Sequence, residues 1–81
     1  MDETQILDRV RTLVEEERVL RQRHWQGELS DDEEQARLRE LEESLDQCWD
    51  LLRQRRALKD AGENPDEAET RPVNQVEGYL Q

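Results

Sequence analysis

The side chains of this sequence that could do chemistry are few and far apart. Cys48 is the only cysteine and His24 the only histidine in a chain of 81 residues. A catalytic thiolate needs a neighbouring base or a positive environment, and the helices predicted below place His24 at the far end of the other helix, against the turn. We therefore predict that Cys48 is an inert, buried side chain and that the protein is not an enzyme.

His24 and Glu17 interrupt an otherwise apolar stripe and are the residues that a metal site on the first helix would use. Di-iron helical bundles place Glu-x-x-His on their helices, and that spacing does not occur here. The hairpin register predicted below faces His24 with Glu34, so an ion pair is the simpler interpretation. We predict no metal and no cofactor.

The run "SDDEE" supplies a second group of chemical side chains. At the tip of a long hairpin, Asp31, Asp32, Glu33 and Glu34 resemble the acidic tip of factors that enter the secondary channel of RNA polymerase, where carboxylates help to hold a catalytic magnesium. The alternative function is therefore an acidic-tip coiled-coil regulator of RNA polymerase. The simpler interpretation is a helix start, because Ser30 and Glu33 have the spacing of a capping box and the aspartates complement the helix dipole.

Charge limits the partners. The net charge is -10 despite the arginine cluster "RQRR", and nucleic acids and anionic membranes are bound by clustered Lys and Arg. We predict no nucleic acid, no membrane, and a protein partner with a basic surface. The single cysteine cannot form an intramolecular disulfide, and the sequence shows no apolar leader or long apolar run. We therefore expect a soluble, reduced, cytoplasmic protein.

The composition predicts an all-α fold with a thin core. Hydrophobic residues make up 32% of the chain and charged residues 42%, there is no Phe, and only three Gly and two Pro interrupt a mixture rich in Leu, Glu, Arg and Gln. Such a chain forms one domain at most. Long helices with one narrow apolar stripe suit it best.

Two helices are expected within a hairpin that spans residues 1–61. The first covers about 3–26, with Asp2 or Thr4 as its cap and Gly27 at its end. A turn over 27–30 leads to the second helix over about 31–60, which Gly62 ends.

The apolar positions of the two helices fit one antiparallel register. Leu20 then faces Leu38 and Leu13 faces Leu45, and opposite charges meet at both ends of the hairpin. We predict an antiparallel coiled-coil hairpin. Its predicted core is Ile6, Val10, Leu13, Leu20, Leu38, Leu41, Leu45, Cys48 and Leu52.

Further apolar residues flank these stripes, and a single hairpin covers only one side of each stripe. A pair of helices this long supplies only about 3 to 5 kcal/mol by itself. We predict that the flanking residues contact a second copy of the chain in a homodimeric four-helix bundle; the alternative leaves the tryptophans exposed or covered by the chain's own tail. The predicted dimer or partner contacts are Leu7, Val14, Trp25, Trp49, Leu51 and Leu58.

The sequence changes character after the second helix. Residues 62–72 are acidic and contain both prolines, which is typical of a linker or a partly ordered arm. Residues 73–81 return to apolar side chains at roughly helical spacing, and we predict that this segment docks on the bundle or on a partner. The docking residues are Val73, Val76, Tyr79 and Leu80.

Several stretches resemble a small bacterial family of uncharacterised proteins, domain of unknown function twenty-six-thirty. They are "LVEEE", "GELSDDEEQARLRELE", "LDQCWDLLRQRRALKDAG" and "RPVNQVEGYLQ", and together they span nearly the whole chain. Members of the family often carry a His directly after the acidic triplet, where this sequence has Arg18, which weakens a metal site on the first helix. The resemblance implies no activity. We predict a small protein-interaction or scaffold module that acts as a homodimer.

Overall fold

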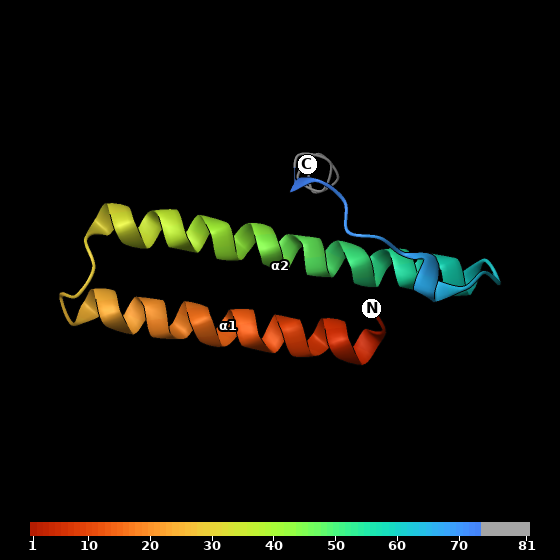
Figure 1. Ribbon diagram of the computed structural model, residues 1–81, viewed down its shortest axis with the longest axis horizontal. Coiled ribbons are helices and arrows are strands. Elements are labelled where there is room, and N and C mark those ends of the chain that lie inside the picture. The colour runs from red at the N-terminus through yellow and green to blue at the C-terminus, as the bar shows by residue number, and fades with distance from the viewer. Residues whose placement is uncertain (74–81) are drawn as a thin grey trace.

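The computed structural model describes residues 1–73, which form two long antiparallel helices and a short segment that turns back (Figure 1). Helix α1 spans Glu3–Trp25, helix α2 spans Asp31–Asp60, and the 3-10 turn η1 spans Pro65–Glu67. The described part of the chain contains no strand. The predicted all-α helical hairpin is confirmed.

The helix ends follow from short-range hydrogen bonds. Asp2 caps α1: its carboxylate accepts from the backbone N–H of Gln5, and the Gln5 side chain accepts from the N–H of Asp2. Each helix ends before a glycine with positive φ, 79° at Gly27 and 76° at Gly62. The N–H groups of Gly27 and Glu28 donate back into the last turn of α1, and those of Gly62 and Glu63 do so in α2. These are the paired hydrogen bonds of a Schellman motif, in which a left-handed residue is required.

The start of α2 differs in one detail from the capping box expected there. The Ser30 hydroxyl oxygen accepts from the N–H of Glu33 at 3.2 Å. The Glu33 carboxylate accepts from the Ser30 hydroxyl at 3.1 Å and not from its backbone N–H. The cap therefore holds the first turn of α2 by one backbone contact, supported by the carboxylate.

The core is concentrated in the half of the hairpin away from the turn. Ile6, Val10 and Leu13 are buried on α1, and Cys48 and Leu51 on α2. Around them pack the partly buried Leu41, Leu45, Leu52 and Ala68. Leu20 and Leu38, expected to form a layer of the core nearer the turn, are only half-buried. Ala68, which follows η1, packs on this core from outside the two helices.

Leu51 is the clearest departure from the expected arrangement. We expected it on a flank that a second chain would cover, but it is only 6% exposed within this chain. Residues 62–73, called the return segment below, run from the end of α2 back along that helix toward its middle (Figure 1). Residues 62–72, which the sequence predicts to be a linker or a partly ordered arm, therefore contact the hairpin through Ala68 and Arg71.

The start of the return segment is ordered by its own polar groups. The Asn64 side chain accepts from the N–H of Asp66 at 3.0 Å, which caps η1. Val73 is half-buried; Val76, Tyr79 and Leu80 lie outside the described residues. Within residues 1–73 neither helix combines the length and the apolar character that crossing a bilayer requires.

Candidate functional site

Cys48 lies in the core and is only 7% exposed. Burial raises the pKa of its thiol, and the nearby positive charge of Arg9 offsets this only in part. The thiol is therefore held in its neutral, weakly nucleophilic form.

His24 joins the end of α1 to the start of α2. Its Nδ1 lies 3.3 Å from Glu34 Oε2, the contact that the hairpin register predicts, and its Nε2 lies 2.6 Å from Asp31 Oδ1. The two ring nitrogens point in different directions, so the two carboxylates do not converge on one point. Within residues 1–73 no three His, Cys, Asp or Glu side chains are grouped as metal ligands.

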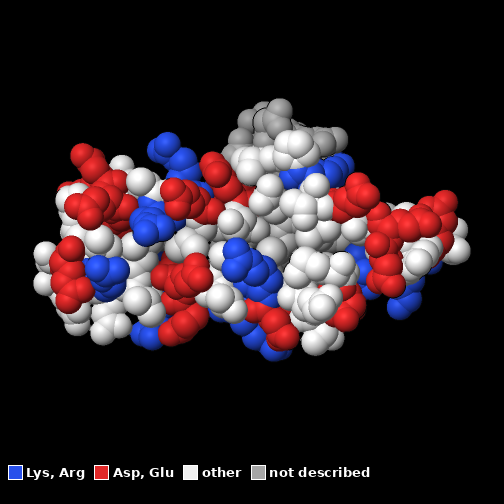
Figure 2. Space-filling model, viewed as in Figure 1, with Lys and Arg blue, Asp and Glu red and all other residues white. Residues whose placement is uncertain are grey.

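The acidic tip is largely engaged in local contacts. Asp31 and Glu34 pair with His24, and the Glu33 carboxylate accepts from the Ser30 hydroxyl. Acidic side chains gather at both ends of the long molecule (Figure 2). The tip thus differs little from the opposite end in charge, and no observation favours a polymerase-directed role for it.

The least expected polar feature is a carboxylate buried beside the core. Asp50, on α2, has no exposed surface. Arg71 of the return segment donates to it from both Nε and Nη2, the Nε contact measuring 2.8 Å, and Gln54 Nε2 donates to Asp50 Oδ2 at 2.9 Å. The hydrogen bond from Arg71 holds the pKa of Asp50 below its ordinary value, although burial acts in the opposite direction.

Two glutamines of α2 hold the backbone of the return segment. Gln54 Nε2 donates to the carbonyl of Glu69 at 2.7 Å, and Gln54 Oε1 accepts from the N–H of the same residue at 3.3 Å. Gln47 Nε2 donates to the carbonyl of Arg71 at 3.2 Å. Nearer the helix end, Arg55 Nη1 bonds to Asp66 Oδ1 at 2.8 Å. Polar contacts therefore carry much of this docking.

Sequence reasoning missed this cluster. One signal was available: Arg71 is the only Lys or Arg after Lys59, in an otherwise acidic stretch. A lone cation among carboxylates suggests a specific partner. The chain offers many acidic residues, however, and nothing in their spacing singles out Asp50.

An apolar surface is left on the side of the hairpin that the return segment does not cover. Helical spacing puts Leu7 and Val14 on one flank of α1, and Leu45, Trp49 and Leu52 on the matching flank of α2. We call these five residues the open face. Val14 is 52% and Trp49 44% exposed, and the other three are half-buried.

The remaining predicted contact residues lie elsewhere. Trp25, at the end of α1, is 89% exposed. Leu58, near the end of α2, is half-buried. Leu51 is in the core.

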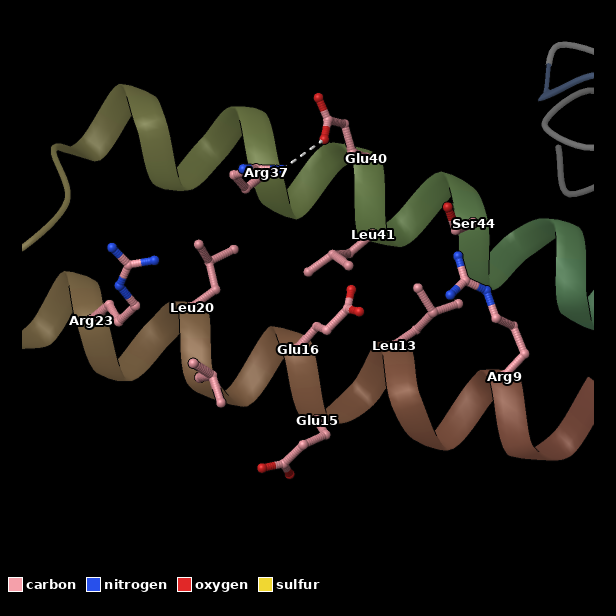
Figure 3. Close-up of a pocket in the computed structure, with 11 residues that line it drawn as sticks. Arg9, Leu13, Glu15, Glu16, Leu20, Arg23, Arg37, Glu40, Leu41 and Ser44 are labelled. Carbon is pink, nitrogen blue, oxygen red and sulfur yellow. Dashed lines mark ion pairs between the residues drawn. The ribbon is translucent and has the colours of Figure 1, made fainter.

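A shallow groove of about 470 Å³ runs between the helices nearer the turn. It lies on the side opposite the open face and is bordered by charges of both signs (Figure 3). Arg9 extends from α1 toward α2 beside Ser44, whereas Glu15 points away from the groove (Figure 3). Leu20 and Leu41 form its floor. The mixture of charges selects no particular class of small molecule.

The fold is that of a small helical hairpin with a return segment docked on α2 and an open face of partly exposed apolar residues. The chain belongs to the family described as "Protein of unknown function (DUF2630)", whose model matches residues 2–81. This confirms the resemblance seen in the sequence.

The chain is similar to an uncharacterised protein of Mycobacterium bovis and to uncharacterised proteins of two Mycobacterium tuberculosis strains. Each is 53% identical over 77 residues, which cover 95% of this chain and 88% of the relative. No solved structure matches the chain.

Proposed function

We propose that this protein is a non-enzymatic, cytoplasmic protein-interaction module that pairs with a second copy of itself through the open face, forming a four-helix bundle. The observation that supports this proposal is the apolar surface left on one side of the hairpin. Trp49 and Val14 remain about half-exposed beside a small core, and contiguous apolar patches on small proteins commonly mark sites of association.

The small core of a single hairpin also supports pairing with a second copy. A hairpin with five buried apolar residues has a core near the lower limit for an independent fold. Pairing two open faces would bury Trp49 and Val14 together with the exposed parts of the half-buried leucines. Each Å² of apolar area that pairing removes from water would stabilise the dimer by about 25 cal/mol.

Charge supports a role for the assembled module in binding a basic protein. The net charge is -10, and acidic side chains are present at both ends of the molecule as well as along its length (Figure 2). A bundle formed through the open face leaves those ends accessible. Electrostatic complementarity of this kind raises association rates and excludes acidic partners.

Sedimentation equilibrium over a wide dilution range tests the pairing, and α1 offers a matched pair of variants. Val14 on the open face and Val19 beside the groove are 52% and 40% exposed. We expect Val14→Gln, and more strongly Trp49→Gln, to shift the chain to monomer, whereas Val19→Gln leaves the association unchanged. A wild-type chain that is a folded monomer at every concentration would remove the homodimer, and equal effects of the two valine variants would remove the open face as its site.

A further inference from the structure

The contacts between α2 and the return segment have the form of a peptide-binding site. Gln47, Asp50 and Gln54 are spaced three and four residues apart, so they lie along one side of α2. Their partners are two residues of the return segment, Glu69 and Arg71. At Glu69 the contacts are to the backbone carbonyl and N–H, and Gln47 binds the backbone carbonyl of Arg71.

These backbone contacts do not depend on the side chains of the bound segment. Every extended peptide offers a carbonyl and an N–H on the same edge of a residue, and the primary amide of Gln54 matches both. Gln47 adds a donor for the carbonyl two residues further on. Peptide-binding proteins commonly obtain affinity from such main-chain hydrogen bonds and specificity from one or two side-chain contacts.

The side-chain contact here requires arginine. Asp50 has no exposed surface in the docked state, and a buried carboxylate is strongly unfavourable unless a cation and hydrogen bonds compensate it. Arg71 supplies two N–H groups, one to each carboxylate oxygen. A lysine presents a single ammonium group and cannot reproduce this fork.

We propose that Gln47, Asp50 and Gln54 form a binding site for an extended, arginine-bearing segment of a partner protein, and that the chain's own residues 69–71 occupy this site in the resting state. The inference deepens the proposed interaction function and rests on it, because it names the partner's chemistry. A segment tethered to its site by a short connection has an effective concentration of about millimolar or higher. A partner must therefore compete with the return segment, which makes the site self-inhibited.

The substitution Arg71→Ala in the chain of 81 residues opens the site without removing any segment. Without the guanidinium, a docked return segment would leave Asp50 buried and unpaired, so undocking and rehydration of Asp50 are favoured. The probe is the end-blocked synthetic peptide EAETRPVN, the sequence of residues 67–74. Binding is followed by NMR through the side-chain amide signals of Gln47 and Gln54.

We expect saturable binding of this peptide to the Arg71→Ala chain and binding at least about tenfold weaker to the wild type, whose own segment competes. A peptide with lysine in place of arginine should bind about tenfold more weakly than the arginine peptide. Adding Asp50→Asn should abolish the preference for arginine. The matched control is Asp46→Asn, one turn earlier on α2, which removes a carboxylate but no contact to residues 69–71 and should leave binding unchanged.

Three results would overturn the proposal: no saturable shift at Gln47 and Gln54, equal binding of the lysine and arginine peptides, or an unchanged preference with Asp50→Asn. Circular dichroism checks that the Arg71→Ala chain keeps its helices; if it does not, Arg71→Lys, which keeps a cation beside Asp50, takes its place. The NMR titration measures peptide binding at Gln47 and Gln54 whether the chain is a monomer or a dimer. Failure of the open face in sedimentation is therefore a separate result.

Discussion

The pairing of Asp50 with Arg71 should be measurable as a coupling free energy of unfolding. Hydrogen bonds that involve a charged group contribute about 1.5 to 3 kcal/mol, and breaking a permanently buried ion pair costs about 3 to 5 kcal/mol. The return segment can peel from α2, however, which lets water reach the carboxylate and caps the loss. We therefore expect Asp50→Asn and Arg71→Gln each to lower the free energy of unfolding by about 2 kcal/mol, or roughly 10 °C in Tm for a domain of this size.

The double variant distinguishes a specific pair from two independent effects. Once either partner is gone, the second substitution has little left to remove, so Asp50→Asn combined with Arg71→Gln should be about as stable as either single variant. Urea denaturation of the four proteins, followed by the helical circular dichroism signal, gives the coupling directly. Single losses that simply add in the double variant would refute the pairing.

The same pair predicts a pH dependence with a defined sign. The pKa of Asp50 in the native state lies below its ordinary value of 3.8, so the native state favours the ionised carboxylate more than the unfolded state does. The resulting stability is fully present above the ordinary pKa and is lost as the pH falls through the lowered one. The difference between wild type and Asp50→Asn should therefore be constant near neutral pH and shrink in acid; a difference that persists in strong acid would contradict this account.

Three further experiments test other parts of the fold. Leu13 is 1% exposed, so Leu13→Ala should lower the free energy of unfolding by about 2 to 5 kcal/mol; the control Val19→Ala should change it by less than about 0.5 kcal/mol. Gly62→Ala should lower the free energy of unfolding by about 1 kcal/mol, because φ at this residue is 76°. Gly27→Ala should lower it by the same amount, because φ is 79° and the surroundings are equally open. A clear difference between the two variants in urea denaturation would show that one glycine has a role beyond backbone conformation. The Cys48 thiol should react with a disulfide reagent far more slowly in native protein than in urea, because burial raises its pKa; equal rates would place it at the surface.

The two helices follow from the sequence because their causes are local. Apolar residues three and four apart require a helix with one buried stripe, and Asp2 and Ser30 supply the caps at the two starts. Glycines at the two ends take the left-handed conformation that other residues resist. The antiparallel register also follows from the pattern, and it correctly faces His24 with Glu34.

The return segment could not be derived in the same way. Its docking joins Asp50 to a residue 21 positions away through polar groups that nothing in the sequence distinguishes from their many polar neighbours, and any exposed carboxylate could have paired with Arg71 on charge alone. The direction in which the chain reverses after Gly62 decides which side of α2 it covers. Leu51 is buried on the covered side, whereas its spacing alone predicted a flank that a second chain would cover.

The sequence by itself therefore determined the hairpin and its ends, because helix periodicity, capping and glycine conformation act within a few residues. Only the tertiary structure decided which flank of α2 is covered and which remains open. That arrangement is stabilised by contacts between residues far apart in the chain, among them the pair in which Arg71 compensates a carboxylate that would otherwise be too costly to bury.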